Sequence, residues 1–363
     1  MNRKVLKAGR SSVLWFAAAC SFAAVVLSLS PISAQAAGQS AAAPMALDTG
    51  YKVVKTFPVP GEGDGAWDYI AVDGNARRVY VSHGDHIQVL NADSGKLVAQ
   101  IAAPGAHGVA LAPELHRGFT SNGRDKSATI FDMTTFEPIE RVPLEGGTDA
   151  ILYDPFTKRV FPMNEKITVF DAQTGEVVGT VSLDGDPEAA VSDGKGTVYV
   201  NEADKQAIAV IDPKALTVTK TYPIKDCISP HSLSFDAETQ RLFVGCRDGF
   251  VAVDATTGKV VGTSLMCTGV DSGGFDPENK LIFVSCGEGV ISVIREMTPD
   301  NYRIIETIPT QLWARTMALD PKTKNIYLPT QDVEWIPDAD PQKAPQRIWK
   351  PGTFKVLVVS RKK

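Results

Sequence analysis

Seven ionisable residues recur at intervals of 39 to 44 residues, each five positions before the residue that opens a repeated polar turn. They are Asp68, His107, Asp149, Glu188, His231, Asp271 and Arg315. All but Arg315 offer carboxylate or imidazole ligands, which together suit a range of divalent cations. We therefore predict that these six residues hold a divalent metal ion of unspecified identity. The alternative is a solvated polar rim without a ligand.

Two of the seven positions suggest further chemistry. His107 and His231 are candidate catalytic bases, because an imidazole can accept a proton from a metal-polarised substrate. Arg315 is a candidate ligand-binding residue, because its guanidinium pairs well with a carboxylate or phosphate. The sequence alone does not establish whether the protein is an enzyme.

A second set of residues lies nine or ten positions after the same turns, at the ends of apolar runs. The candidate ligand contacts in this set are His83, Asn122, Asn164 and Glu202. Residues 331–352 add a long loop at the same end of the molecule. Its Trp335 is predicted to contact a ligand if the loop is a lid, whereas the loop could equally be a plug that packs against the first repeat.

The elements that position these residues follow from an internal repeat. Stretches such as "AVDGNARRVYVS", "SFDAETQRLFVG" and "GFDPENKLIFVS" mark seven units of about forty residues, a period typical of propeller blades. Each unit contains four short apolar runs, separated by turns rich in Asp and Gly. We predict an all-β, seven-bladed β-propeller whose innermost strands bring the seven ionisable residues to one mouth of the central channel.

The ends of the chain predict how the ring closes. The seventh unit lacks a fourth strand, and the missing alternation is present at residues 51–60, "YKVVKTFPVP". An N-terminal strand in the last blade would cover two exposed sheet edges. We therefore expect residues 51–363 to form one domain, preceded by a flexible tail at residues 37–50.

These motifs carry a family resemblance. The R-V-Y-V-S and L-F-V-G runs, the D-x-x-T-G turns and the final "PGTFKVLVVSR" resemble the YVTN-repeat, YncE-like propellers exported by bacteria, over the whole chain after residue 36. The resemblance implies the fold and export. It implies little about activity, since propellers are scaffolds for many functions. DNA binding is known within the resemblance.

The N-terminus predicts export. Residues 1–36 resemble a signal peptide, with Arg3, Lys4, Lys7 and Arg10 before an apolar stretch and "AQA" at residues 34–36. A retained anchor and a lipoprotein at Cys20 are the alternatives. Cleavage would remove four positive charges and no acids, so the formal charge moves from −5 to −9. This balance argues against nucleic-acid binding. We predict a periplasmic or secreted monomer with no membrane span.

Four cysteines remain after residue 36, in two matched pairs: Cys227 with Cys246, and Cys267 with Cys286. An even count in an oxidising compartment favours disulfides. Pairing within each repeat is the preferred connectivity. A Cys246–Cys267 bridge between repeats and a thiolate metal site are the alternatives.

The sequence contains no serine-hydrolase, zincin, P-loop or dinucleotide-binding motif. The preferred interpretation is an exported propeller that binds a small molecule or a divalent metal at the channel mouth, as in a metal-assisted lyase or lactonase. The alternatives are a non-catalytic module that binds a protein of the cell envelope, and a DNA-binding propeller, which the acidic charge disfavours.

Overall fold

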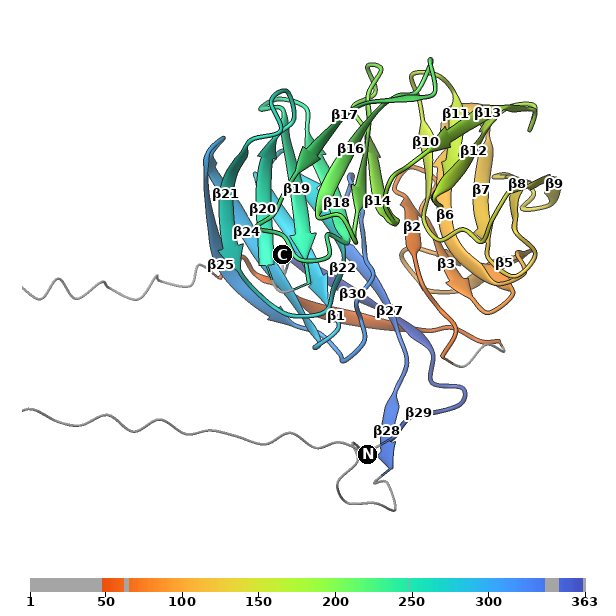
Figure 1. The fold of residues 1–363 in the computed structure, drawn as a ribbon. Helices are drawn as coiled ribbons and strands as arrows, with labels where there is room; N and C mark the ends of the chain where they lie inside the picture. The colour runs from red at the N-terminus through yellow and green to blue at the C-terminus, as the bar shows by residue number, and fades with distance from the viewer. Residues whose placement is uncertain (1–47, 62–64, 248, 337–345, 362–363) are drawn as a thin grey trace, which may run out of the picture. The chain divides into compact units, whose positions relative to one another are not determined.

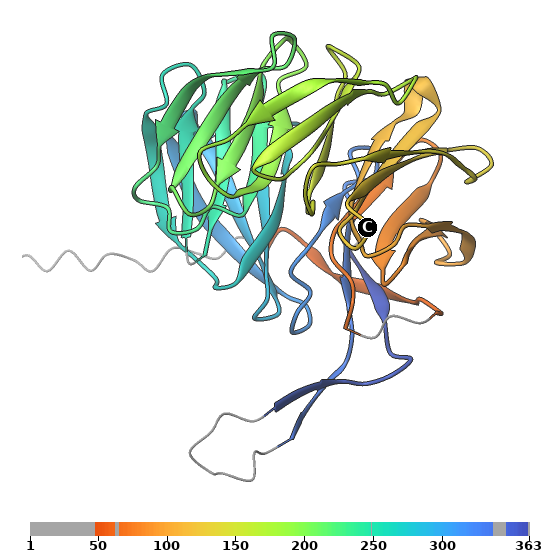
Figure 2. The same ribbon diagram turned by 45° about the vertical axis from the view of Figure 1, so that its right-hand side comes forward.

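The computed structural model describes residues 48–61, 65–247, 249–336 and 346–361. Within these residues, seven four-stranded antiparallel sheets form a ring, and one further two-stranded hairpin extends from the seventh sheet (Figures 1 and 2). The prediction of an all-β, seven-bladed propeller is confirmed. The predicted signal peptide at residues 1–36, and residues 37–47 of the predicted tail, lie outside the described residues.

The strands of the blades follow the chain in order. Blades 1 and 2 comprise β2 (Ile70–Asp73), β3 (Arg78–His83), β4 (His86–Asn91), β5 (Leu97–Ala102), β6 (Ala106–Ala112), β7 (Arg117–Asn122), β8 (Ser127–Asp132) and β9 (Pro138–Pro143). A single 3-10 turn, η1 (Pro113–Leu115), separates β6 from β7. Blades 3 and 4 comprise β10 (Ile151–Asp154), β11 (Arg159–Pro162), β12 (Lys166–Asp171), β13 (Val177–Ser182), β14 (Pro187–Ser192), β15 (Val198–Glu202), β16 (Ala207–Asp212) and β17 (Thr217–Pro223).

The remaining blades repeat this arrangement until the last one. Blades 5 and 6 comprise β18 (Ser232–Asp236), β19 (Arg241–Cys246), β20 (Gly249–Asp254), β21 (Val260–Leu265), β22 (Val270–Asp276), β23 (Leu281–Cys286), β24 (Val290–Thr298) and β25 (Asn301–Pro309). Blade 7 comprises β26 (Ala318–Leu319), β27 (Ile326–Thr330), β30 (Lys355–Arg361) and β1 (Tyr51–Pro58), and the hairpin comprises β28 (Val333–Ile336) and β29 (Gln346–Trp349).

The turn between the first two strands of a blade fixes their register. In blade 1, the Asp73 carboxylate accepts hydrogen bonds from the backbone N–H groups of Asn75 and Ala76, each at 2.9 Å. Arg77 then takes a left-handed conformation with φ 55°, which lets the chain reverse into β3. This turn recurs with the same length in most blades, and the residue five positions before it lies at or just before the start of the first strand in each blade.

The N-terminal strand closes the ring. β1 pairs antiparallel with β30, from Tyr51 opposite Arg361 to Pro58 opposite Lys355. The order of strands in this sheet is β1-β30-β27-β26. The outermost strand of blade 7 is therefore supplied by the start of the described chain, as the sequence predicts. Just before it, the N–H of Thr49 donates to the Glu306 carboxylate at 3.0 Å.

The core of the protein lies between blades. Seven buried apolar clusters fill the seven interfaces between neighbouring blades, such as Tyr80 of blade 1 with Phe131 of blade 2. At the turn end, Arg77 of blade 1 pairs with the fully buried carboxylate of Asp320 in blade 7. Apolar packing and such ion pairs hold each blade against its neighbours.

One disulfide in blade 5 and one in blade 6 each join the loop before the first strand to the last residue of the second strand. Cys227 is bonded to Cys246 with a Cα–Cα distance of 5.2 Å, and Cys267 to Cys286 with 6.0 Å. The structure therefore has the within-repeat connectivity, and neither the Cys246–Cys267 bridge nor the thiolate site is formed. Disulfides of this kind are typical of an oxidising, extracellular environment. Across the described ranges, no helix is long and apolar enough to span a membrane.

Candidate functional site

The seven recurring ionisable residues meet at one mouth of the channel, and we call them the mouth cluster. They are Asp68, His107, Asp149, Glu188, His231, Asp271 and Arg315, one from each blade in ring order. Each lies one to three residues before, or at the start of, the first strand of its blade. Backbone bonds fix their spacing: for example, the N–H of Tyr69 in blade 1 donates to the carbonyl of His107 in blade 2 at 3.2 Å.

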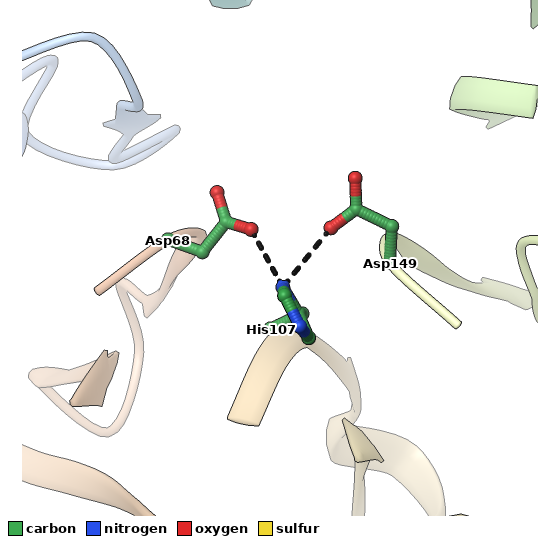
Figure 3. Close-up of side chains that lie close together, drawn as sticks. All are labelled: Asp68, His107 and Asp149. Atoms are coloured by element: carbon green, nitrogen blue, oxygen red, sulfur yellow. Dashed lines mark hydrogen bonds and ion pairs between the residues drawn. The ribbon is translucent and has the colours of Figure 1, made fainter. Parts of the chain in front are cut away.

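Three members of the cluster form the strongest candidate for a metal site (Figure 3). The Nδ1 atom of His107 lies 2.9 Å from Asp68 Oδ2 and 3.3 Å from Asp149 Oδ1. These three potential ligand atoms all lie within 4.8 Å of one another. The side chains of His107 and Asp149 are each 42% exposed, whereas that of Asp68 is 13% exposed. The triad is therefore reachable from solvent while one ligand is anchored inside.

The remaining members extend the cluster in both directions around the ring. Arg315 Nε lies 3.0 Å from Asp271 Oδ2, and its Nη2 lies 3.7 Å from Asp68 Oδ1. The Nε2 atom of His231 lies 3.7 Å from Glu188 Oε1. The Asp68 carboxylate is thus shared between His107 on one side and Arg315 on the other.

The mouth cluster has more carboxyl groups than positively charged groups, and this imbalance shifts several pKa values. Burial, reinforced by the charges of Asp149 and Asp271, raises the pKa of Glu188 to about 8. Burial also raises the pKa of Asp68 to about 7, although its hydrogen bond with His107 opposes the rise. In turn, the hydrogen bonds to Asp149 and Asp68 raise the pKa of His107 to about 10. The mouth therefore retains protons, as expected where a cation is needed to balance negative charge.

The two imidazoles differ in what they can do. His231 Nδ1 lies 2.8 Å from the carbonyl oxygen of Ser229, so this nitrogen donates to the carbonyl, and in the neutral ring Nε2 is the acceptor. That lone pair faces the mouth beside Glu188. His107 instead directs Nδ1 between two carboxylates. Geometry thus favours His107 as a ligand and His231 as the base.

A hollow of about 670 Å³ opens on the triad side of the mouth, and we call it the acidic hollow. Blades 2, 3 and 4 line it, and it includes His107, Asp149, Glu188 and Asn164 from the predicted set. Its other charged residues are Glu145, Glu165, Lys166 and Asp186. Beside Glu188, whose pKa is raised to about 8, four carboxylates outnumber Lys166 and the imidazole of His107, so the hollow is net negative.

A second hollow of about 700 Å³ lies beside blades 5, 6 and 7, and we call it the aromatic hollow. It is lined by His231, Asp271 and Arg315 of the mouth cluster together with mostly apolar surface. The predicted Trp335 lines it from β28, and its side chain is half exposed. The two predicted ligand-binding residues Trp335 and Arg315 therefore come together on the opposite side of the cluster from Asn164.

Three of the predicted ligand contacts lie inside their blades, and neither hollow is lined by them. Asn122 is fully buried and bonds to Thr129 Oγ1 at 2.9 Å. Buried Glu202 accepts the backbone N–H groups of Asp184 and Gly185 at 3.1 and 3.0 Å. The buried ring of His83 stacks on Phe354 at 4.0 Å and lies 3.3 Å from the Gln88 amide. In the structure these side chains support strands and loops.

The long loop of blade 7 combines the two roles considered for it. Trp349 packs against Trp67 of blade 1 with ring centroids 4.5 Å apart, which is the behaviour of a plug. Trp335, in the paired strand, instead faces the aromatic hollow. Residues 337–345 of this loop lie outside the described residues.

Several hydroxyl groups that position the cluster were not among the predicted residues. Ser82 Oγ accepts the N–H of Asp68 at 2.7 Å, and Thr316 donates to the Asp68 carbonyl at 2.6 Å. Ser121 and Ser285 donate in the same way to the carbonyl groups of the cluster residues in the next blade, Asp149 and Arg315. The signal was visible: "YVSH", "FTSN" and "FVSC" place a serine next to last in the second strand of three blades.

Comparisons with known proteins support the architecture. No protein-family profile matches the chain, and no curated protein matches its sequence. Among solved structures, the hydrazine synthase of Kuenenia stuttgartiensis is similar with a TM-score of 0.65 and 13% sequence identity, covering 80% of this chain and 97% of that chain. At this identity the likeness shows the fold alone.

Proposed function

We propose that this protein binds a divalent metal ion at Asp68, His107 and Asp149 and uses it to hold a small ligand at the channel mouth. The observation that carries the proposal is the convergence of one imidazole nitrogen and two carboxylate oxygens within 4.8 Å. The raised pKa values of His107, Asp68 and Glu188 support it, because they mark a site that is short of positive charge. We further propose that the chain is an exported member of the YVTN-repeat, YncE-like group.

The donor set fits a borderline or hard divalent ion. One imidazole with carboxylates suits zinc, iron or manganese better than copper(I), which prefers sulfur ligands. The side-chain hydroxyl groups of Ser82, Ser121 and Thr316 fix the backbone of Asp68 and Asp149, which supplies the outer support that metal ligands need. Binding would require His107 to lose its shared proton, so we expect affinity to rise with pH.

The same arrangement suits a lyase or lactonase. A bound ion would polarise a carbonyl or carboxylate oxygen of the ligand and make a neighbouring proton more acidic. His231 keeps its Nδ1 proton on the Ser229 carbonyl and offers Nε2 as the proton acceptor. Arg315, held by Asp271, would neutralise an anionic group of the ligand. The residues thus divide into ligand, base and anion clamp.

A second candidate function is a non-catalytic module that binds an envelope protein. Three apolar side chains of the β28–β29 hairpin support it, because Trp335, Ile336 and Ile348 are 50%, 43% and 44% exposed. Trp335 lies on one face of the hairpin and Ile336 and Ile348 on the other, and exposed apolar surface of this kind often marks a protein interface. This function requires no metal at the mouth.

Metal analysis tests the proposed function directly. After dialysis against chelator, the protein is titrated with Zn²⁺ and Mn²⁺ by calorimetry at pH 7.5. We expect one site per chain, and loss of at least tenfold in affinity in a His107→Gln variant. A His86→Gln variant is the matched control, because exposed His86 lies at the same end of blade 1 and outside the cluster. Equal titrations for wild type and His107→Gln would refute the site.

A further inference from the structure

The aromatic hollow has the composition of a binding site for the body of a ligand. Leu312, Ile228 and Trp335 line it with side chains that are 45%, 53% and 50% exposed. Large apolar side chains that remain exposed around a concave surface usually contact a ligand or partner. Its volume of about 700 Å³ lies within the range of small-molecule sites.

The wall of this hollow is built with unusual backbone conformations. Trp313 takes a left-handed φ of 68°, which is rare for a bulky side chain and tends to occur at functional sites. Its N–H donates to the Gly287 carbonyl at 2.8 Å. Gly289, with φ 93°, lets this segment approach, since a Cβ there would lie 2.9 Å from the backbone of Gln311 and Leu312. The hydrogen bond to Gly287 and the close approach at Gly289 therefore hold the Trp313 backbone in place.

Two cations, Arg247 and Arg315, and two carboxylates, Asp271 and Glu288, line the hollow. Arg315 is neutralised by Asp271 at 3.0 Å, and Glu288 accepts a hydrogen bond from Thr268 at 2.8 Å. Among the described residues, no carboxylate lies within salt-bridge distance of the exposed Arg247. The neighbouring His231 adds a donor or acceptor at the inner end. An anionic ligand group would pair with Arg247 here, whereas the acidic hollow across the mouth would repel one.

We propose that the aromatic hollow binds a small carboxylate with an aromatic body, placing the carboxylate between Arg247 and Arg315 and the ring against Trp313 and Trp335. The two hollows then have different roles. The acidic hollow attracts the metal cation, and the aromatic hollow holds the organic anion. What happens to the bound ligand rests on the proposed metal function, but its binding does not and is measurable without metal.

The experiment is a calorimetric titration of chelator-treated protein with 3-phenylpropionate, its neutral isostere 3-phenylpropanamide, and acetate. We expect saturable binding of 3-phenylpropionate, at least tenfold weaker binding of the amide because a charge-assisted bond is lost, and no measurable binding of acetate. Arg247→Gln should weaken binding at least tenfold, and Trp335→Ala about fivefold or more.

Two control variants keep the outcome interpretable. Arg124→Gln removes an exposed Arg that pairs with Asp85 and does not line the hollow. Ile336→Ala shortens the next residue of β28, whose side chain points to the other face of the strand. Both should bind 3-phenylpropionate as wild type does. The proposal is overturned if 3-phenylpropionate does not bind at concentrations up to about 10 millimolar. It is also overturned if Arg247→Gln and Trp335→Ala both bind 3-phenylpropionate as tightly as wild type does. Neither result would bear on metal binding at the triad.

Discussion

Replacing Glu188 by Gln is expected to stabilise the metal-free protein at alkaline pH, although it removes a side chain of the candidate site. Burial and the charges of Asp149 and Asp271 raise the pKa of Glu188 from 4.5 to about 8. The folded chain therefore holds this proton longer than the unfolded chain does. The free energy of unfolding must then fall as the pH rises from about 4.5 through about 8.

The size of the effect follows from the same numbers. A pKa difference between 4.5 and about 8 corresponds to about 5 kcal/mol at 1.36 kcal/mol for each pH unit. The side chain of Glu188 is 20% exposed, so water screens part of this, and we expect about 2–3 kcal/mol. Glutamine has the same shape and no charge. The variant should therefore match wild type near pH 4.5 and be more stable above pH 8.

The assay is urea unfolding followed by circular dichroism at pH 4.5, 7 and 9 in the presence of chelator. A Glu165→Gln variant is the control, because Glu165 lines the same hollow but is exposed. It should change stability by less than about 0.5 kcal/mol at every pH. If Glu188→Gln and wild type lose stability in parallel between pH 4.5 and 9, burial and the charges of the mouth do not raise the pKa of Glu188. Our electrostatic account would then be wrong.

Three further predictions concern the scaffold. Deletion of β1 should expose an edge of blade 7 and abolish cooperative melting, as followed by calorimetry, and a monomeric truncation of unchanged stability would contradict the closure. A Cys227→Ala/Cys246→Ala variant should lose roughly 3 kcal/mol in urea unfolding, because the bridge spans 19 residues, and an unchanged midpoint would count against it. Arg77→Ala should cost roughly 3 kcal/mol or more, since the buried Asp320 carboxylate would lose its cationic partner, whereas a loss below 1 kcal/mol would show that water replaces the guanidinium.

The fold was predictable because its signals are local and repeated. The turn opened by Asp73 and its copies needs only the residues beside it, and the strands around it alternate in the usual way. The missing strand of blade 7 was also visible, because residues 51–60 carry the same alternation. Even the pairing of Cys227 with Cys246 followed from counting residues outwards from one turn.

The candidate site was predictable in its members but not in its contacts. A fixed distance from each turn identified the seven residues of the mouth cluster. Which of them touch depends on side-chain lengths and on how closely blades approach. Gly108, for example, lets blade 3 come near, since a Cβ there would lie 3.0 Å from the Asp149 carbonyl oxygen. Such contacts join residues about forty positions apart, and no local pattern encodes them.

The residues at the ends of the second strands were harder to interpret from the sequence than the mouth cluster. The sequence groups Asn122 and Glu202 with His83, because they occupy similar positions after the turn. All three side chains are buried at the last residue of a second strand, where Asn122 bonds to Thr129 and Glu202 accepts the backbone N–H of Gly185. Spacing alone could not tell a side chain that faces the mouth from one that supports a loop.

The most direct test of the central claim is a crystal structure of the protein grown with Zn²⁺, with data collected at the zinc absorption edge. Our account predicts one strong anomalous peak at the channel mouth, within about 2.0–2.2 Å of His107 Nδ1 and of carboxylate oxygens of Asp68 and Asp149. The His107→Gln variant should lose the peak under the same conditions. An ordered mouth with no anomalous peak, and with His107 still bonded to both carboxylates, would contradict the metal site and leave an ion-pair network in its place.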